Sequence, residues 1–546
     1  MKKSSFVEGT IIATLSIFIV KILGMLYVIP FYAMIGIQGS ALYAYAYNIY
    51  SIFLDISTAG LPIAISKIIN EFDTLGKMEA KQRTYQIGKK ILFFAAVAIF
   101  MILMIFANQI ATALIGNLKG GNTVEDAALA IRTVSFAILV VPFLSVSKGY
   151  LQGHKIINVS SVSQVIEQVV RIAVILIGCF IALKVFGAST TTAVCIAVSG
   201  AFFGALAGYI YVLIKIHKHK KELHANTRKK DEEITNNDIV KKIITYAVPF
   251  IIINVLSSLY NFADMVITLR TLNYLELPTS DIEFIASSIS TWSTKISVII
   301  ASVAMGMSTS LIPTIVTAFT KKDFKQVNDK LNQALQMIIT ISLPMALGIA
   351  LLSKPIWSIF YGLTNDYGPM ILSIAVFVAM LGNIYMITSS TLQSLNKFKL
   401  VYTSAVFGLL VNALLDFPIM YFYSKVGIPV CLGPSTASII GYSISSLYAL
   451  HKLKKEHELN YGKTLKLIGK LIIPTIVMAL IVIGLKYIIP VDYSNKISCV
   501  LFVAIISIIG AAIYIILLSI NKTLQNVLGE SQYRKIMNKL TFSKIK

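Results

Sequence analysis

The segment KGYLQGHKIINVSSVSQVIEQVVRIAVILIGCF, residues 148–180, combines a long apolar run with charged and amide side chains. Valine, isoleucine and leucine dominate its second half, which also carries Gln164, Glu167, Gln168 and Arg171. These four positions are spaced as i, i+3, i+4 and i+7, so a helix places them on one face. The meaning of that polar face depends on what surrounds the helix, and the composition of the chain indicates this.

The composition is that of a membrane protein. The chain has 546 residues, of which 56% are hydrophobic and 13% are charged, and its mean hydropathy is +0.78. A soluble domain would carry about 25% charged residues. Apolar runs of roughly 20 residues, the length that a membrane-spanning helix needs, recur along almost the whole chain. We expect an all-α polytopic membrane protein with about fourteen transmembrane helices, near residues 10–36, 41–67, 91–117, 125–147, 157–184, 187–214, 243–269, 284–312, 333–353, 369–391, 399–424, 428–450, 468–489 and 497–520.

The formal net charge of +23 is concentrated in alternate connecting segments. Lysine and arginine crowd residues 77–90, 217–230, 321–325 and 452–455, whereas the connections between these are short and nearly free of both. The positive-inside rule therefore places the basic segments and both termini on the cytoplasmic side of the membrane. Basic loops favour anionic lipid headgroups. This accounts for the charge without a nucleic-acid partner.

Two pairs of similar segments indicate an internal repeat. LQGHKIINVSSVS, from Leu151, resembles LQSLNKFKLVYTSAV, from Leu392, and GLPIAISKIINEFDTLGKMEAKQ, from Gly60, resembles SLIPTIVTAFTKKDFKQVNDK, from Ser310. Six spans return the chain to the same side, so we expect two six-helix lobes in a parallel repeat. The expected parts are an N-terminal lobe at 1–216, a cytoplasmic linker at 217–240, a C-terminal lobe at 241–453, two further helices at 454–521 and a basic cytoplasmic tail at 522–546.

The repeat bears on the polar face, because Glu167 and Arg171 align with Leu409 and Ala413 in the second lobe. The fold therefore does not require a charged pair at this position. A charge at the bilayer centre costs roughly 2.5–3.5 kcal/mol on insertion scales, so the face must meet a cavity or a partner helix. Glu167 and Arg171 can neutralise each other at i, i+4 spacing. A structural staple and a direct part in transport both fit this pattern.

Further ionisable residues lie within the expected spans. They are Lys21, Asp55, Asp264, Lys295 and Asp416. Lys21 has no carboxylate within one helical turn, so it requires an anionic ligand, water or a distant partner, for which Asp55 is a candidate. Lys295 and Asp55 are further candidates for the substrate-binding site, whereas we interpret Asp264 and Asp416 as structural.

No pattern typical of an enzyme is found. The six histidines lie in connections or at helix ends, without metal-ligand spacing to the four cysteines. GKT at 462–464 resembles the end of a phosphate-binding loop, but His457 stands where the required glycine would be. The outer connections are too short for a catalytic domain. We therefore expect a protein that is not an enzyme and that uses no metal or cofactor.

Four segments together resemble a known family: VKILGMLYVIPF at 20–31, STAGLPIAISK at 57–67, SQVIEQVVR at 163–171 and LQSLNKFK at 392–399. They are similar to the polysaccharide-transport branch of the multidrug/oligosaccharidyl-lipid/polysaccharide exporter superfamily, and most of all to the MurJ-like lipid II flippases and SpoVB-like sporulation proteins of Firmicutes. The resemblance implies two six-helix lobes and two extra C-terminal helices. It also implies export of an undecaprenyl-pyrophosphate-linked sugar from the bacterial cytoplasmic membrane by alternating access, for cell-wall or polysaccharide synthesis beside other cell-wall proteins.

In the MurJ-like family, arginines of the first and eighth helices face the central cavity. The resemblance matches Lys21 to the first of these, and Lys295 is the nearest cation to the second. Lysine keeps the charge but loses bidentate recognition of a pyrophosphate. Two other functions remain open. A cation-coupled drug exporter of the same superfamily should favour carboxylates in its cavity, and a membrane glycosyltransferase or ligase would need acidic or histidine groups at the outer face.

The predicted orientation can be tested by cysteine labelling in a cysteine-free background. A membrane-impermeant reagent added from outside should label single cysteines introduced near residues 276–281 and should miss those in 77–90, 217–230 and 452–466. Labelling of residue 225 from outside would overturn the orientation together with the expected number of spans.

Overall fold

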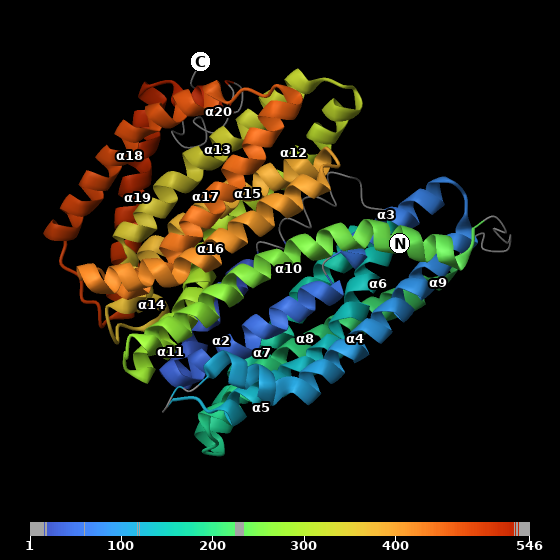
Figure 1. Ribbon diagram of the computed structural model, residues 1–546, viewed down its shortest axis with the longest axis horizontal. Coiled ribbons are helices and arrows are strands. Elements are labelled where there is room, and N and C mark those ends of the chain that lie inside the picture. Colours follow the sequence, from blue (N-terminus) through green and yellow to red (C-terminus); the bar gives the residue numbers. More distant parts are fainter. Residues whose placement is uncertain are drawn as a thin grey trace. The chain divides into compact units, whose positions relative to one another are not determined.

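The computed structural model describes residues 16, 19–58, 60–116, 118, 121–154, 156–223, 234–528, 530 and 533. Throughout these residues the regular structure is helical (Figure 1). Residues 19–26 form the first helical segment. The chain divides into two compact units, Met1–Thr291 (unit 1) and Trp292–Lys546 (unit 2). An all-helical fold is thereby confirmed.

Unit 1 is built from long helices and short helical connections. Its elements are α2 (Val28–Thr58), α3 (Leu61–Thr74), α4 (Met78–Ile115), α5 (Val124–Ser135), η1 (Phe136–Leu139), α6 (Val141–Gly153), α7 (Ile157–Phe180), η2 (Ile181–Val185), α8 (Thr190–Lys218), α9 (Lys220–Leu223), α10 (Asn236–Tyr274) and α11 (Thr279–Ser287). The π-helical turn η3 (Ser288–Trp292) follows α11. Thr235 and Asp238 form a reciprocal capping box at the start of α10, which explains why the helix begins there.

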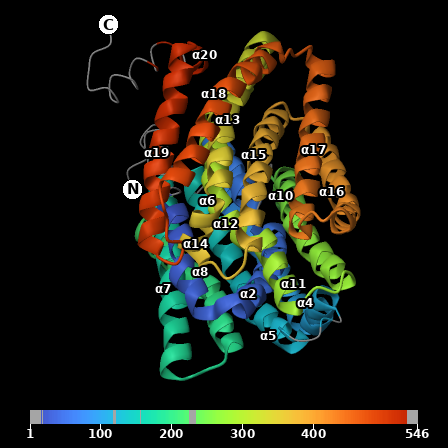
Figure 2. The same cartoon turned by 90° about the vertical axis from the view of Figure 1, so that its left-hand side faces the viewer.

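Unit 2 contains the remaining elements. They are α12 (Ser293–Thr320), α13 (Phe324–Leu351), α14 (Ser353–Tyr361), α15 (Tyr367–Ser394), α16 (Phe398–Val426), η4 (Val430–Leu432), α17 (Gly433–His457), α18 (Gly462–Ile488), α19 (Lys496–Ile520) and α20 (Thr523–Leu528). Figures 1 and 2 both show α18 beside α19 and α16 beside α17, and these helix pairs are in contact.

Among the described residues, twelve helices are long and apolar enough to cross a membrane, so the chain is a multi-pass membrane protein. The expected spans at 10–36 and 41–67 overlap a single candidate, Val28–Thr74, and residues 1–15 lie outside the described part of the chain. The expected span at 428–450 coincides with α17, a serine-rich helix that is not among the twelve. Ser445 of α17 donates to the carbonyl oxygen of Ser404 on α16, so this polar helix side meets a neighbouring helix. The count of about fourteen stays a prediction.

Helix α2 is not one continuous rod. Gly36 has φ 64 and ψ −167, so two helices meet at this residue. A side chain at such a positive φ would be strained, and glycine avoids that cost. The break leaves a short helical part before Gly36 and a longer one after it, up to Thr58.

Helix α10 packs with unit 1, against α2, α3 and α4. Gly60, just before α3, explains how closely it approaches, because a Cβ at this position would lie 2.1 Å from the carbonyl oxygen of Ala247 on α10. The compact units therefore divide at Thr291, whereas the repeat predicted from the sequence divides at residues 217–240. The boundary at Thr291 reflects packing in space, whereas the boundary at 217–240 reflects similarity between sequence segments. The two lobes of the repeat stay a prediction.

The pair α7 and α8 explains how the polar face of α7 is oriented. Gly200, Gly204 and Gly208 follow one another at four-residue spacing on α8, and a Cβ at Gly204 would lie 2.6 Å from the backbone oxygen of Glu167. Such small-residue stripes let membrane helices approach until their backbones touch. At Gly200 and Gly208, a Cβ would lie 3.1 Å from atoms of Arg171 and Ser163. The backbone of α7 is therefore fixed against α8 at the level of the charged pair.

Candidate functional site

A third charged residue, Lys148, joins Glu167 and Arg171 of α7, and the sequence did not predict this contact. Nζ of Lys148, on α6, lies 3.1 Å from Oε2 of Glu167, and Nη2 of Arg171 lies 3.2 Å from Oε1 of the same carboxylate. Two cations thus share one anion, and the cluster carries one net positive charge. Its side chains are only 13–21% exposed.

One hydrogen-bond donor of the cluster has no partner among the described residues. This donor is Nε of Arg171, which is buried. Tyr43, Tyr47 and Tyr50 of α2 lie close enough to Arg171 to interact electrostatically with its guanidinium. The rings of Tyr43 and Tyr47 stack with their centroids 5.6 Å apart. Tyrosine suits this place, because its ring packs against apolar groups while its hydroxyl can form hydrogen bonds.

The helical segment 19–26 packs against the same face of α7. A Cβ at Gly24 would lie 3.4 Å from Nε2 of Gln168, so the two helices approach closely there. Lys21 precedes Gly24 by three residues, which places both on the same side of their helix. The structure thus brings the segment that carries Lys21 next to the polar face of α7. Gln164 is the exposed member of that face, and Gln168 is buried.

The other candidate residues have separate surroundings. Asp55, on α2, accepts a hydrogen bond from Oγ of Ser258 on α10. Asp264 is buried on α10, with 6% of its surface exposed. Lys295 is partly exposed on α12 and belongs to unit 2, whereas Lys21 belongs to unit 1. The cavity that Lys21 and Lys295 were expected to share therefore stays a prediction.

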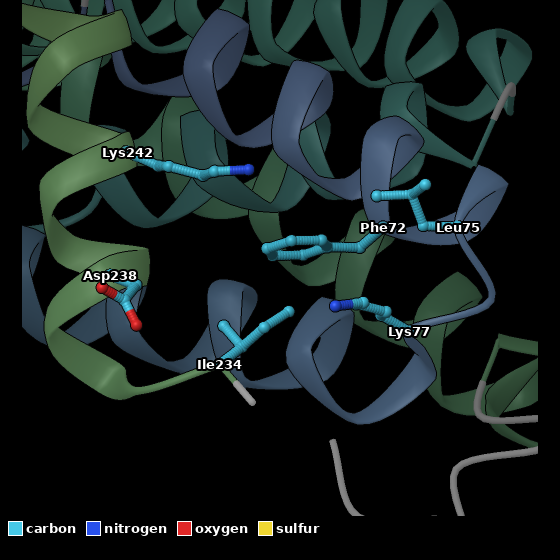
Figure 3. Close-up of a pocket in the computed structure, with 6 residues that line it drawn as sticks. All are labelled: Phe72, Leu75, Lys77, Ile234, Asp238 and Lys242. Atoms are coloured by element: carbon cyan, nitrogen blue, oxygen red, sulfur yellow. The ribbon is translucent and has the colours of Figure 1, made fainter. Parts of the chain in front are cut away.

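A separate small cavity lies where α3 and the start of α10 meet. Its volume is about 230 Å³, and its lining consists of Phe72, Leu75, Lys77, Ile234, Asp238 and Lys242 (Figure 3). In this view Phe72 lies between the two lysines, and Nζ of Lys242 is 5.0 Å from the centre of its ring. Lys242 also pairs with Glu71 at 2.5 Å. This cavity is lined by none of the candidate residues.

Two observations of the sequence could have located Lys148 and the close helix contact. Lys148 directly follows the expected span at 125–147, where a long side chain can reach a partner in the membrane. The glycines at 200, 204 and 208 form a small-residue repeat that is visible without a structure. Neither observation identifies the partner helix, since that depends on tertiary packing.

Comparison with known proteins agrees with this architecture. The sequence profile described as "Polysaccharide biosynthesis protein" matches residues 6–319, and the profile described as "MatE" matches residues 249–417. The chain is 30% identical to the lipid II flippase MurJ of Bacillus subtilis (strain 168) over 94% of each sequence. It is 20% identical to the stage V sporulation protein B of the same organism, over 76% of this chain and 78% of that protein. A solved structure of lipid II flippase MurJ in an inward closed conformation matches with a TM-score of 0.67 at 18% identity, over 94% of this chain and 99% of that one.

The fold and these matches define a polytopic helical membrane protein with the transporter fold of the multidrug/oligosaccharidyl-lipid/polysaccharide exporter superfamily. Since the matched profile covers more than half of the chain, the chain belongs to the polysaccharide biosynthesis protein family.

The ion cluster yields a prediction about stability. Glu167→Gln removes the only anion of the cluster and leaves Lys148 and Arg171 uncompensated in a largely buried place. We expect it to lower the free energy of unfolding by about 1–3 kcal/mol, which is less than for a fully buried pair because water partly screens these groups.

Glu456→Gln provides the matched control, because it removes the more exposed ion pair of Glu456 with Lys397. That change should cost at most about 1 kcal/mol. Thermal unfolding of both purified variants in detergent measures the difference. Equal melting temperatures would show that the cluster contributes no more than a surface pair.

Proposed function

We propose that this chain is a flippase that moves a polyprenyl-pyrophosphate-linked sugar precursor, such as lipid II, across the bacterial cytoplasmic membrane by alternating access. Membership of the polysaccharide biosynthesis protein family supports this proposal, as does the similarity to a curated lipid II flippase over nearly the whole chain. The observation that carries it in the structure is the positive charge of the polar face on α7.

The charge of this face matches the headgroup of such a substrate. A pyrophosphate is anionic, and in a membrane interior it needs cations that are not fully neutralised by the protein. Lys148 and Arg171 together exceed Glu167 by one charge, and Lys21 lies on the helix packed against the same face. Arginine offers planar, paired donors to phosphate oxygens, and Nε of Arg171 is one donor that no described residue occupies.

The mechanism that we propose keeps the polyprenyl tail in lipid while the headgroup enters a cavity that opens to the cytoplasm. The cations of unit 1, with Lys295 in unit 2, then compensate the phosphate charge while the cavity changes its opening from the inside to the outside. Movement of charge through the membrane potential is worth about 2.3 kcal/mol per charge for each 100 mV and can drive such a step. The basic cytoplasmic segments would contact anionic lipid headgroups. Lys77 and Lys242, which line the small cavity, would take part in this contact.

The alternative function is that of a drug exporter of the same superfamily, and the match to the MatE profile supports this alternative. Cationic drugs would be attracted by unpaired carboxylates. At the polar face of α7, the carboxylate of Glu167 is shared by two cations, and on α2 the carboxylate of Asp55 accepts a hydrogen bond from Ser258. The excess positive charge therefore favours an anionic substrate.

The test of the proposed function uses a strain in which the resident lipid II flippase can be depleted. The native chain should restore growth and prevent the accumulation of lipid-linked precursor in the inner leaflet. Lys21→Ala should abolish complementation at a near-normal protein level, because a cation for the headgroup is lost. Lys21→Arg should retain function, since it keeps the charge and adds a planar fork for phosphate.

A charge swap distinguishes ligand contact from an internal ion pair. If Lys21 serves mainly to balance Asp55, then Lys21→Asp combined with Asp55→Lys should restore growth. If Lys21 contacts the headgroup, the doubly substituted chain stays inactive. A functional swap would remove Lys21 from the proposed binding site, and failure of the native chain to complement would contradict the flippase itself.

A further inference from the structure

We propose that Glu283 is a proton-binding site whose protonation loosens the end of unit 1 at which α2, α5 and α11 meet. Glu283 lies on α11 within the candidate membrane span Thr279–Ser308, and only 2% of its surface is exposed. Nothing in the charged cluster of α7 involves it. Its role in transport rests on the proposed flippase function, whereas the binding of a proton does not.

The hydrogen bonds of Glu283 all converge on one oxygen. Oε1 accepts from the backbone N–H of Asn122 at 3.0 Å, from Nδ2 of Asn122 at 3.0 Å and from the hydroxyl of Tyr45 at 3.4 Å. Oε2 accepts no hydrogen bond from any described residue. This division is the one that a carboxylic acid makes, because its carbonyl oxygen accepts while its other oxygen carries the proton.

Within the part of the chain that the structure describes, the neighbours of Glu283 do not include a compensating cation. The titratable groups that act on it are Tyr45 on α2 and Asp126 on α5, and Asp126 carries the same sign of charge. Helix α10 packs against α11, but its Arg270 donates instead to the backbone oxygen of Ala113. No lysine, arginine or histidine in the described part of the chain forms an ion pair with Glu283. A buried carboxylate without a cation is costly in its charged form, so exchange of a proton is the available relief.

The oxygen that is free to carry a proton, Oε2, lies next to a residue that is exposed to solvent. Gly121 is exposed and has φ 96, and a Cβ at this position would lie 2.8 Å from Oε2. Glycine therefore leaves the protonatable oxygen close to the surface of the protein. The proton comes from the aqueous phase at this end and returns to it, so no other reactant is needed.

Protonation would act on the contacts between three segments. An ionised carboxylate makes stronger hydrogen bonds than a neutral acid, so the charged form holds Asn122 and Tyr45 more tightly. The segment with Asn122 is also tied to α2, because Nδ2 of Asn122 donates to the backbone oxygen of Gln38 at 2.9 Å and Nε2 of Gln38 donates to the backbone oxygen of Gly121 at 3.2 Å. Uptake of a proton therefore weakens the link of α11 to α2 and to the start of α5. The positive-inside rule places this end outside, where a transporter must open to release its substrate.

The most direct experiment measures hydrogen–deuterium exchange of the Asn122 amide, since that N–H donates to Glu283. The full-length protein is studied in lipid nanodiscs over a series of pH values, and rates are corrected for the intrinsic effect of pH. In the native protein, protection should fall by about tenfold as the pH is lowered. In Glu283→Gln, which keeps an acceptor oxygen but cannot ionise, protection should not depend on pH.

Glu125→Gln is the matched control, because Glu125 is exposed in the first turn of α5 near the same segment. It should behave like the native protein. Protection that is independent of pH in the native protein, or equally dependent on pH in Glu283→Gln, would overturn the proton site, and the first of these outcomes needs no variant to fold.

Coupling to transport is tested separately in proteoliposomes that contain a lipid-linked sugar precursor. Lowering the pH of the aqueous phase at the Glu283 end should change the rate of translocation by the native protein and by Glu125→Gln, but not by Glu283→Gln. An equal response of Glu283→Gln would contradict the coupling. Absence of translocation by the native protein at any pH would contradict the flippase function, while the exchange experiment would still decide whether Glu283 binds a proton.

Discussion

A charged side chain in the middle of a membrane helix cannot face lipid, and this constraint explains how unit 1 is arranged around α7. One side of α7 is pressed against the glycines of α8, so close that no side chain fits between the backbones at Gly204. The polar face meets Lys148 of α6 and the helical segment with Lys21 and Gly24. Neighbouring helices thus enclose Glu167 and Arg171, and the tyrosines of α2 supply the nearby aromatic surface.

Much of this architecture is visible in the sequence, because the length of an apolar run and the spacing of polar residues are local properties. The helical class, most of the spans and the single polar face of α7 follow from them. Lys148 was missed because its partnership with Glu167 depends on how α6 packs against α7. The grouping of α10 with unit 1 also depends on packing, at the close contact of Gly60 with Ala247. For α17 the sequence predicts the helix itself. Whether this serine-rich helix crosses the membrane depends on the helices that pack against it.

The charged cluster on α7 and the buried Glu283 on α11 suggest two different roles in unit 1. We propose that the cluster of Lys148, Glu167 and Arg171 offers positive charge to an anionic headgroup, while Glu167 compensates part of that charge when no substrate is present. Glu283 forms no ion pair with any described residue and connects segments that are separate in the sequence, so we propose that it changes its protonation state instead of binding substrate. Membership of the polysaccharide biosynthesis protein family agrees with the binding of an anionic headgroup, and it does not bear on the protonation of Glu283.

We propose that the cluster on α7 recognises the pyrophosphate through its excess positive charge, in addition to joining α6 and α7. The most direct measurement is the affinity of the purified protein for lipid II, compared with undecaprenol, which lacks the pyrophosphate. The variant is Lys148→Gln, Glu167→Gln and Arg171→Gln combined, which removes the excess charge without leaving an uncompensated ion. The account predicts a melting temperature close to that of the native protein and an affinity for lipid II that is lower by at least about tenfold, with undecaprenol unaffected. Native affinity for lipid II in this variant would contradict the account and leave the cluster with a structural role alone.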